Sequence, residues 1–341
     1  MKVGVIGLGD MGMGHLRTVR GFSFVDQAIG CDLSATQRAR AEQEGIATLP
    51  DLPTLLAARP DAVLVVTAPA AHAACIRPFL EAGIPVFTEK PLATDPAESR
   101  ALVALAQARD VNFQVGFELR YCGLTRAMKQ VVESGRLGRP VKMCLVQISG
   151  CKPTAGYMTL ERTGGIFYEK LCHQIDIFRY WLGEPTRIMA HAGPPVLKHY
   201  GIPDNATAVL EFSNGRCGAI TFSATRAAHI GGLNDHPDRG HYYEMVLTCE
   251  RGALAFNGWT EAIDVVEFNH REDLKTELVE RIDVREQFGE PVYDLVTQDG
   301  DFLESVRHRR PPTHPASDAQ RSMEWVEKAE ESLRRHGEWI A

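Results

Sequence analysis

The stretch that decides the fold is Lys2–Gly12, KVGVIGLGDMG. Lys2 to Ile6 is a short apolar run ended by a glycine, which predicts a buried strand that leads into a turn. Three glycines follow in the spacing G-x-G-x-x-G, from Gly7 to Gly12, and the residues after them predict a helix through Arg20. Together these features predict a parallel sheet whose strands alternate with helices on both faces.

A second predicted strand, Phe24 to Cys31, ends next to Asp32, twenty residues after Gly12. In this context the glycine turn predicts a dinucleotide-binding site, because side chains there would keep a pyrophosphate from the helix N-terminus. The predicted cofactor-binding turn consists of Gly7, Leu8, Gly9, Asp10, Met11 and Gly12. Asp32 would accept hydrogen bonds from ribose hydroxyls and repel a 2'-phosphate, which predicts NAD. Arg38 on the next helix keeps NADP as an alternative.

Two further strands end in residues that we assign to the cofactor site. Asp61 to Thr67, DAVLVVT, is a continuous apolar run typical of a central buried strand. Ligands bind beyond the carboxyl ends of such strands, so Thr67, Pro69 and His72 are expected near the nicotinamide. For His72, an ordinary position at the start of a helix is the alternative.

The strand Ile84 to Thr88 runs into Glu89-Lys90-Pro91. Pro91 cannot donate to a ladder and disfavours helical geometry at Lys90, so the strand stops and presents the lysine at the edge of the sheet. We assign Glu89 and Lys90 to the cofactor site as well. A solvated lysine in a turn is the alternative for Lys90.

A candidate catalytic helix spans Thr163 to Gly183, TGGIFYEKLCHQIDIFRYWLG. At helical spacing Glu169, His173 and Asp176 share one face beside apolar residues. This arrangement predicts a proton-transfer histidine held by carboxylates. The alternative is a helix edge with an ordinary Glu-His pair.

Together these motifs resemble the glucose-fructose oxidoreductase, inositol dehydrogenase and rhizopine-catabolism family. The residues that carry the resemblance are Gly7 to Gly12, Thr67-Ala68-Pro69 with His72, Glu89-Lys90-Pro91, Gly116-Phe117 with Arg120-Tyr121, and Gly164-Gly165 with His173 and Asp176. Most relatives carry aspartate where this chain has Glu169. The resemblance implies that Lys90 lies by the nicotinamide and the substrate hydroxyl, and that a second subunit covers the C-terminal sheet in a homodimer or homotetramer.

The resemblance further implies an NAD-dependent dehydrogenase that oxidises a secondary hydroxyl of a sugar, sugar acid or cyclitol, or reduces the matching ketone. His173 would remove the hydroxyl proton, Lys90 would stabilise the oxyanion, and Glu169 would position the substrate. The roles of Lys90 and His173 are interchangeable at this stage. Two alternatives remain open: a redox-neutral glycosidase or eliminase that uses transient sugar oxidation, and a non-catalytic NAD(H)-binding sensor.

The fold class expected is α/β, with a Rossmann domain over 1–120 and an α+β domain over 121–341. In the second domain, many short predicted strands indicate a large, mainly antiparallel sheet. Asn214-Gly215 predicts a hairpin turn between two of these strands. Two helices, at 293–307 and 318–336, are expected at the end of the chain. Arg120, Lys152 and Tyr157 are candidate substrate contacts. A buried ion pair is the alternative for Arg120, and a solvated loop position is the alternative for Lys152.

Composition narrows the class of protein. The net charge of −7 and the lack of a basic stripe argue against nucleic-acid binding. Eight cysteines without a C-x-x-C pair suggest neither a zinc ribbon nor a disulfide framework. His229, His236 and His241 match no compact metal motif, so no metal is expected. No long apolar run predicts a membrane span, and a cytoplasmic location is expected.

Overall fold

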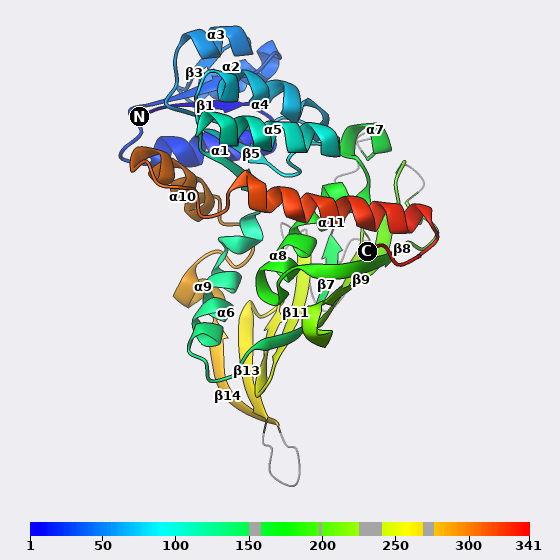
Figure 1. Cartoon of the computed structure of the whole chain (residues 1–341). Helices are drawn as coiled ribbons and strands as arrows, with labels where there is room; N and C mark the ends of the chain where they lie inside the picture. The colour runs from blue at the N-terminus through cyan, green and yellow to red at the C-terminus, as the bar shows by residue number, and fades with distance from the viewer. Residues whose placement is uncertain (150–157, 198–199, 225–240, 269–275) are drawn as a thin grey trace. The chain divides into compact units, whose positions relative to one another are not determined.

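The structure is a computed structural model that describes residues 1–149, 158–197, 200–224, 241–268 and 276–341 (Figure 1). Its packing divides the chain into two compact units. The first comprises Met1–Glu118, Glu161–Gly164 and Leu295–Glu324, and the second comprises Leu119–Leu160, Gly165–Asp294 and Trp325–Ala341.

The first unit contains a six-stranded sheet in the order β3-β2-β1-β4-β5-β6, and all of its pairings are parallel. The strands are β1 Lys2–Ile6, β2 Gln27–Cys31, β3 Ala47–Leu49, β4 Ala62–Val65, β5 Val86–Glu89 and β6 Phe113–Gly116. The Rossmann sheet expected from the glycine turn is therefore confirmed. β2 starts at Gln27 instead of Phe24, because a turn closed by Val25 N–H to Phe22 O at 3.0 Å precedes it.

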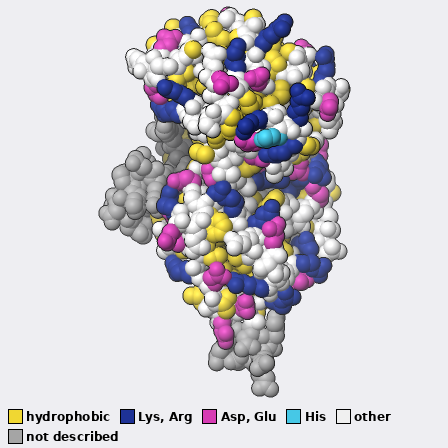
Figure 2. Space-filling view, turned by 90° about the vertical axis from the view of Figure 1, so that its left-hand side faces the viewer, with side chains coloured by type: hydrophobic (Ala, Val, Ile, Leu, Met, Phe, Trp, Pro, Cys, Tyr) yellow, Lys and Arg dark blue, Asp and Glu magenta, His cyan; other side chains and the backbone are white. Residues whose placement is uncertain are grey.

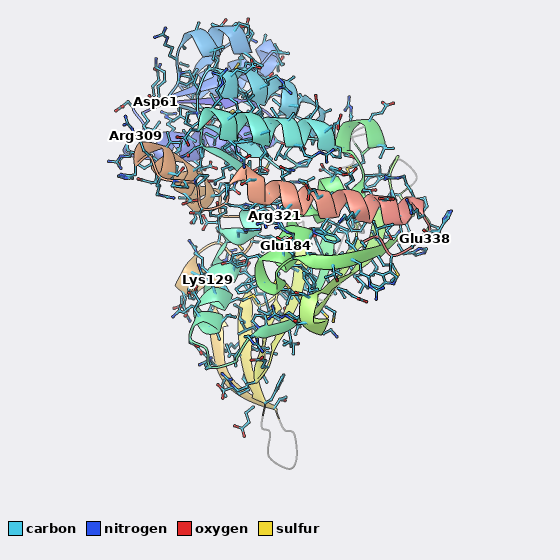
Figure 3. The ribbon with its side chains drawn as sticks, viewed as in Figure 1. Asp61, Lys129, Glu184, Arg309, Arg321 and Glu338 are labelled. Carbon is cyan, nitrogen blue, oxygen red and sulfur yellow. The ribbon has the colours of Figure 1, made fainter. Side chains whose placement is uncertain are left out.

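Three helices of this unit begin at a residue whose side chain caps them. The helices of the unit are α1 Asp10–Gly21, α2 Ala35–Gln43, α3 Leu52–Ala57, α4 His72–Glu81, α5 Pro96–Arg109, the short α7 Leu160–Thr163 and α10 Leu295–Arg307. Ser34, Asp51 and Asp95 each accept a backbone N–H from the first turn of the helix that follows. Asp61, labelled in Figure 3, accepts the Lys2 N–H at 2.7 Å at the entry to β4.

The core of the first unit lies between the sheet and helices that are far apart in sequence. Val5, Leu64 and Phe87 form a buried cluster with Leu16 of α1 and Phe302 of α10. The predicted second domain, 121–341, includes the helix at 293–307, whereas α10 packs into the core of the first unit. Apolar periodicity identifies the buried face of a helix but not the sheet that the face covers.

The second unit contains an eight-stranded sheet in the order β14-β13-β12-β11-β7-β10-β9-β8, in which only the β7–β10 pair is parallel. The strands are β7 Pro140–Ser149, β8 Pro185–His191, β9 Asn205–Phe212, β10 Cys217–Ser223, β11 His241–Cys249, β12 Gly252–Asn257, β13 Ala262–Phe268 and β14 Thr276–Asp283. Asn214 and Gly215, at φ 68° and 74°, make the predicted turn between β9 and β10. The mainly antiparallel sheet is confirmed, and β14 is an element that the sequence analysis did not predict.

The second unit also contains several helices, two of which pack against the sheet. The helices are α6 Gly123–Glu133, the π-helix Phe167–Leu171, α8 Cys172–Leu182, α9 Val284–Phe288 and the second half of α11 Ala316–Arg334. Gly218 of β10 has no side chain because a Cβ there would overlap the ring of Phe178 in α8. Among the described residues, no helix combines the length and the apolar character needed to cross a membrane. On the face shown in Figure 2, lysine and arginine side chains are interspersed with acidic ones.

Candidate active site

The glycine turn of the first unit leaves room for a ligand at the start of α1. Gly7 has φ +92°, and a Cβ there would lie 2.7 Å from Val66 O. A Cβ on Gly12 would overlap the carbonyl of Gly7, so this glycine allows close packing of helix and turn. A Cβ on Gly9 would meet nothing within 4 Å. Gly9 therefore faces open space at a helix N-terminus, which suits a pyrophosphate.

Asp32 and Arg38 shape the loop after β2. The carboxylate of Asp32 accepts the Leu8 N–H at 2.7 Å and the Ser34 N–H at 2.8 Å. The guanidinium of Arg38 donates to the carbonyls of Asp32 and Leu33 at 2.8 and 3.1 Å. Arg38 thus supports the loop that carries the carboxylate. This arrangement fits a ribose with a free 2'-hydroxyl better than a 2'-phosphate.

A cavity of about 390 Å³ lies beside this loop. It is lined by residues that include Gly7, Asp32, Leu33, Pro53 and Thr67. Leu33 is 85% exposed and supplies apolar surface at its edge. A largely apolar lining that includes the Asp32 carboxylate suits an adenosine, so the residues present fit NAD.

His72, which is expected near the nicotinamide, is a buried residue at the start of α4. Its side chain is fully buried, with Nδ1 2.7 Å from Pro91 O and Nε2 3.0 Å from Thr67 O. Burial lowers the pKa of His72, although its bonds to the two carbonyls oppose that shift. His72 therefore ties together the loops after β4 and β5. Thr67 lies on the cavity wall, and Pro69 is buried in the turn that precedes α4.

Lys90 follows the last residue of β5, as predicted, and its peptide bond to Pro91 is cis. Glu89 Oε2 accepts the backbone N–H of Lys90 at 3.1 Å. The other oxygen, Oε1, lies 3.2 Å from Nε2 of His15. His15 and its further partner Asp299 were missed by the sequence analysis. His15 lies three residues after Gly12 on α1, but no local pattern points to Asp299, 284 residues away.

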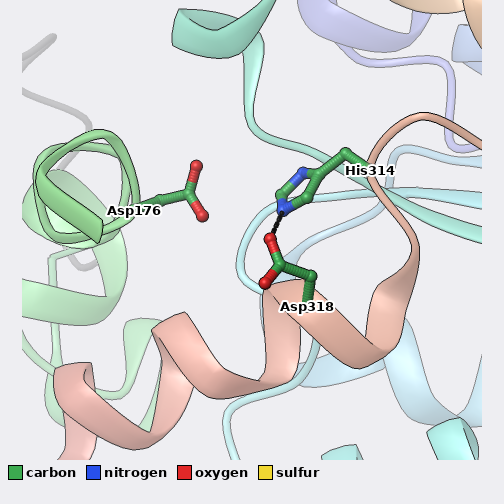
Figure 4. Close-up of side chains that lie close together, drawn as sticks. All are labelled: Asp176, His314 and Asp318. Carbon is green, nitrogen blue, oxygen red and sulfur yellow. Dashed lines mark ion pairs between the residues drawn. The ribbon is translucent and has the colours of Figure 1, made fainter. Parts of the chain in front are cut away.

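A second histidine-carboxylate pair of this unit lies at the start of α11. His314 Nε2 is 3.2 Å from Asp318 Oδ2 (Figure 4), and the His314 ring packs at 5.5 Å from Phe117. Figure 4 also draws Asp176, which belongs to the second unit and is described below with Arg120. The pair anchors the loop before α11.

The candidate catalytic residues of the second unit lie on an irregular helix. Glu169 and His173 are both 6% exposed, and Asp176 is fully buried. Glu169 lies in the π-helix Phe167–Leu171, and α8 starts at Cys172 after Leu171 at φ −109° and ψ 2°. The expectation of one continuous α-helix is therefore wrong. A π-turn changes the angular spacing of side chains, so the simple i, i+4 rule does not fix how Glu169 and His173 align.

The π-helix begins over a buried carboxylate. Glu330 of α11 accepts the Phe167 N–H at 2.7 Å, and a Cβ on Gly165 would overlap its carboxyl group. Burial raises the pKa of Glu330 to about 7, against the opposing effects of the Phe167 hydrogen bond and Arg334. No local sequence pattern predicts this role for Glu330, because it lies 163 residues from Phe167.

Arg120 makes an ion pair, which is the alternative that the sequence analysis left open. Its Nε and Nη2 donate to Asp176 at 2.6 and 2.7 Å, and its guanidinium lies 5.3 Å from the Tyr180 ring centre. Arg179 is 4.0 Å from the same carboxylate and also pairs with Glu184, labelled in Figure 3. This network holds α8 against the segment that follows β6.

Several predicted residues fall outside the described part of the chain. These are Lys152 and Tyr157, and the histidines His229 and His236. Lys90 belongs to the first compact unit and His173 to the second.

The fold and the cofactor site define an NAD-binding oxidoreductase. Residues 1–117 match the family model of an oxidoreductase family with an NAD-binding Rossmann fold, and residues 125–255 match the model of the GFO/IDH/MocA C-terminal domain. The chain belongs to the GFO/IDH/MocA oxidoreductase family, which confirms the resemblance.

Curated relatives share this membership. The chain is 30% identical over 235 residues to scyllo-inositol 2-dehydrogenase (NAD(+)) of Bacillus subtilis (strain 168), covering 66% of this chain and 68% of the relative. It is 29% identical over 230 residues to myo-inositol 2-dehydrogenase of Thermotoga maritima, covering 64% and 67%.

Solved structures show the same fold. An oxidoreductase from Agrobacterium radiobacter, in complex with NAD+, L-tartaric acid and magnesium, aligns with TM-score 0.82 at 19% identity over 100% of this chain and 98% of that one. A levoglucosan dehydrogenase in complex with NADH and levoglucosan aligns with TM-score 0.81 at 18% identity and the same coverage.

Proposed function

We propose that this protein oxidises a secondary hydroxyl of a sugar, sugar acid or cyclitol with NAD+, or reduces the matching ketone. The observation that carries the proposal is the Rossmann cofactor site whose fifth strand ends in Glu89-Lys90-Pro91. The names of two relatives, both inositol 2-dehydrogenases, support a polyhydroxylated ring as the substrate.

The residues would divide the chemistry as follows. NAD+, when bound, supplies the hydride acceptor. His173 removes the hydroxyl proton, because an imidazole titrates near working pH. Lys90 donates a hydrogen bond to the developing oxyanion, and Glu169 positions the substrate or tunes the histidine. The buried position of Glu169 and His173 supports a site that excludes bulk water.

A substrate panel tests this proposal. Aldoses, uronic acids, inositols and levoglucosan are each incubated with NAD+, and NADH is followed at 340 nm. We expect turnover with at least one sugar or cyclitol. Release of an aglycone without net NADH would identify the redox-neutral alternative instead, and no reaction across the panel in either direction would contradict the proposal.

We also propose a homodimer or homotetramer formed through the sheet of the second unit. Gly218 faces α8, and Met143, opposite it on β7, is buried. On the other face Cys144, Val246 and Ala255 lie opposite one another on three strands and are only partly buried. A sheet face with apolar side chains suits a partner subunit. The described cysteines are all free, which supports the proposed cytoplasmic location.

A further inference from the structure

Three ionisable side chains from three elements of the first unit meet beneath the end of β5. Asp299 of α10 lies with Oδ1 and Oδ2 at 3.0 and 2.9 Å from Nδ1 of His15 on α1. Nε2 of the same imidazole lies 3.2 Å from Oε1 of Glu89. The side chains of His15 and Asp299 have no exposed surface, and that of Glu89 is 12% exposed.

This cluster is expensive to bury. Each ion withdrawn from water loses several kcal/mol of solvation, which the pairing only partly restores, so apolar residues of similar size would serve the core as well. A role beyond core packing is therefore expected for the cluster.

The two flanking carboxylates favour a protonated imidazole. Nδ1 is hydrogen-bonded to Asp299, and Nε2 lies at ion-pair distance from Glu89, so a positive charge on the ring is attracted from both sides. Burial lowers the pKa of His15, but the charges and hydrogen bonds of Asp299 and Glu89 outweigh it and raise the pKa to about 10. Burial raises the pKa of Asp299, and His15 opposes that rise. We place the shared proton on His15, because it lies between two carboxylates.

Glu89, the most exposed member of the cluster, contacts the backbone of Lys90. Glu89 Oε2 accepts the backbone N–H of Lys90 at 3.1 Å. Gly116 on the neighbouring strand β6 leaves space for Glu89, since a Cβ there would lie 2.7 Å from Oε1. Phe87 packs beside His15 with ring centres 5.6 Å apart. One oxygen of Glu89 thus contacts His15, and the other accepts the backbone N–H of Lys90.

We propose that Asp299, His15 and Glu89 form a positioning relay that holds the Glu89-Lys90 corner in the geometry that hydride transfer requires. The inference rests on the proposed function, in which Lys90 acts on the substrate. It adds to that function two positioning residues, one on the dinucleotide-binding helix and one 284 residues away in the chain.

The relay has a consequence for pH dependence. Asp299 and Glu89 raise the pKa of His15, while His72 and Lys90 lie next to Glu89. In the wild-type protein the imidazole keeps both N–H groups until the pH approaches about 10. Without the Asp299 charge the proton leaves His15 at lower pH, and a neutral imidazole no longer attracts the Glu89 carboxylate by its charge.

The experiment compares Asp299→Asn and Glu89→Gln with Lys90→Met as reference and Asp301→Asn as matched control. Asp301 lies on the same helix and pairs with Arg310 at 2.8 Å, outside the relay. Initial rates with NAD+ and myo-inositol are measured from pH 6 to 10, and NAD+ affinity is measured by calorimetry. The protonation of His15 is followed by nitrogen NMR without substrate.

We expect both relay variants to lower kcat roughly 10-fold, as the loss of a charged hydrogen bond predicts, with NAD+ affinity within about threefold. In Asp299→Asn the alkaline loss of activity moves to lower pH, which a purely structural role would not produce. Asp301→Asn keeps the wild-type profile, and wild-type His15 stays protonated from pH 6 to 9.

Two results overturn the relay. The first is that both relay variants keep the wild-type kcat and pH profile while Lys90→Met is inactive. That result would reject the relay but not the proposed function. The second is titration of wild-type His15 between pH 6 and 9, which decides the matter even if Asp299→Asn does not fold. Full activity of Lys90→Met would instead reject the proposed function itself.

Discussion

Two glycines of the cofactor site, Gly12 and Gly9, are important because they lack a Cβ atom. Gly12 and Gly9 belong to the same turn but need glycine for different reasons. At Gly12 a Cβ would overlap the backbone of Gly7, whereas at Gly9 it would enter the open space in front of α1. Gly12 is therefore needed for the fold, and Gly9 is needed for ligand binding.

Substitution by alanine separates these two roles. We expect Gly12→Ala to lower the melting temperature by several degrees, because backbone must shift to admit the methyl group. Gly9→Ala should leave the melting temperature nearly unchanged and weaken NAD+ binding roughly 10-fold or more, because the methyl group meets the pyrophosphate. Scanning and titration calorimetry measure both effects. Gly21→Ala, whose Cβ would meet nothing within 4 Å at the end of α1, is the control. Equal effects of Gly9→Ala and Gly21→Ala on NAD+ affinity would count against this site.

Asp32 makes a second prediction at this scale. Replacing it by alanine removes the acceptor for the Leu8 and Ser34 N–H groups and for a ribose. NAD+ affinity should fall roughly 10-fold, while NADP+ affinity should fall less or rise, because the repulsion of a 2'-phosphate is gone. Competition binding of the two cofactors measures the ratio. An unchanged ratio would show that Asp32 does not discriminate between them.

At the scale of elements, local signals predicted most of the fold but not its irregular parts. The turn from Gly7 to Gly12 and the Asn214-Gly215 hairpin were predictable, because each depends on backbone conformations that its own residue types favour. β14, TELVERID, was not, because it is an exposed strand with charges on both faces. The π-helix from Phe167 was also missed, because helical spacing alone does not reveal one extra residue per turn.

Glu330, which supports that π-helix, gives a prediction about stability. Its pKa is about 7 in the folded protein and near 4.5 when unfolded, so the folded state binds more protons between these values. The free energy of unfolding should therefore fall as the pH rises from about 4.5 to 7, by ~3 kcal/mol at most. Glu330→Gln keeps an acceptor for the Phe167 N–H without this titration.

Urea unfolding at pH 5 and pH 8 measures the difference. The stability of Glu330→Gln relative to wild type should increase between these pH values. Glu331→Gln, the same change one residue later at a site paired with Arg335, should follow wild type. Parallel pH dependence in all three proteins would contradict the buried state of this carboxyl group.

At the scale of the whole molecule, the parts that sequence could not predict are those made by distant segments. His15 and Asp299, and α10 with the first sheet, come together only through tertiary packing. The strand-end motifs at Asp32 and Lys90 were predictable, because the carboxyl ends of parallel strands share one edge.

The proposed assembly is a prediction at this scale. Wild-type protein should have a mass that is a multiple of the single-chain mass, 37.7 kDa, in light scattering. Val246→Asp should lower it toward one chain, because a carboxylate on the outward sheet face would be buried in the interface. Lys129→Ala, at an exposed position of α6 (Figure 3), is the control. A wild-type mass of one chain would contradict the assembly.

We propose that Lys90 and His173 transfer the proton that accompanies hydride transfer to NAD+. Absorbance of NADH at 340 nm, with the best substrate of the panel, tests it directly in Lys90→Met and His173→Ala. We expect kcat to fall roughly 100-fold or more in each variant, with NAD+ affinity little changed. Near wild-type turnover in both variants would contradict it.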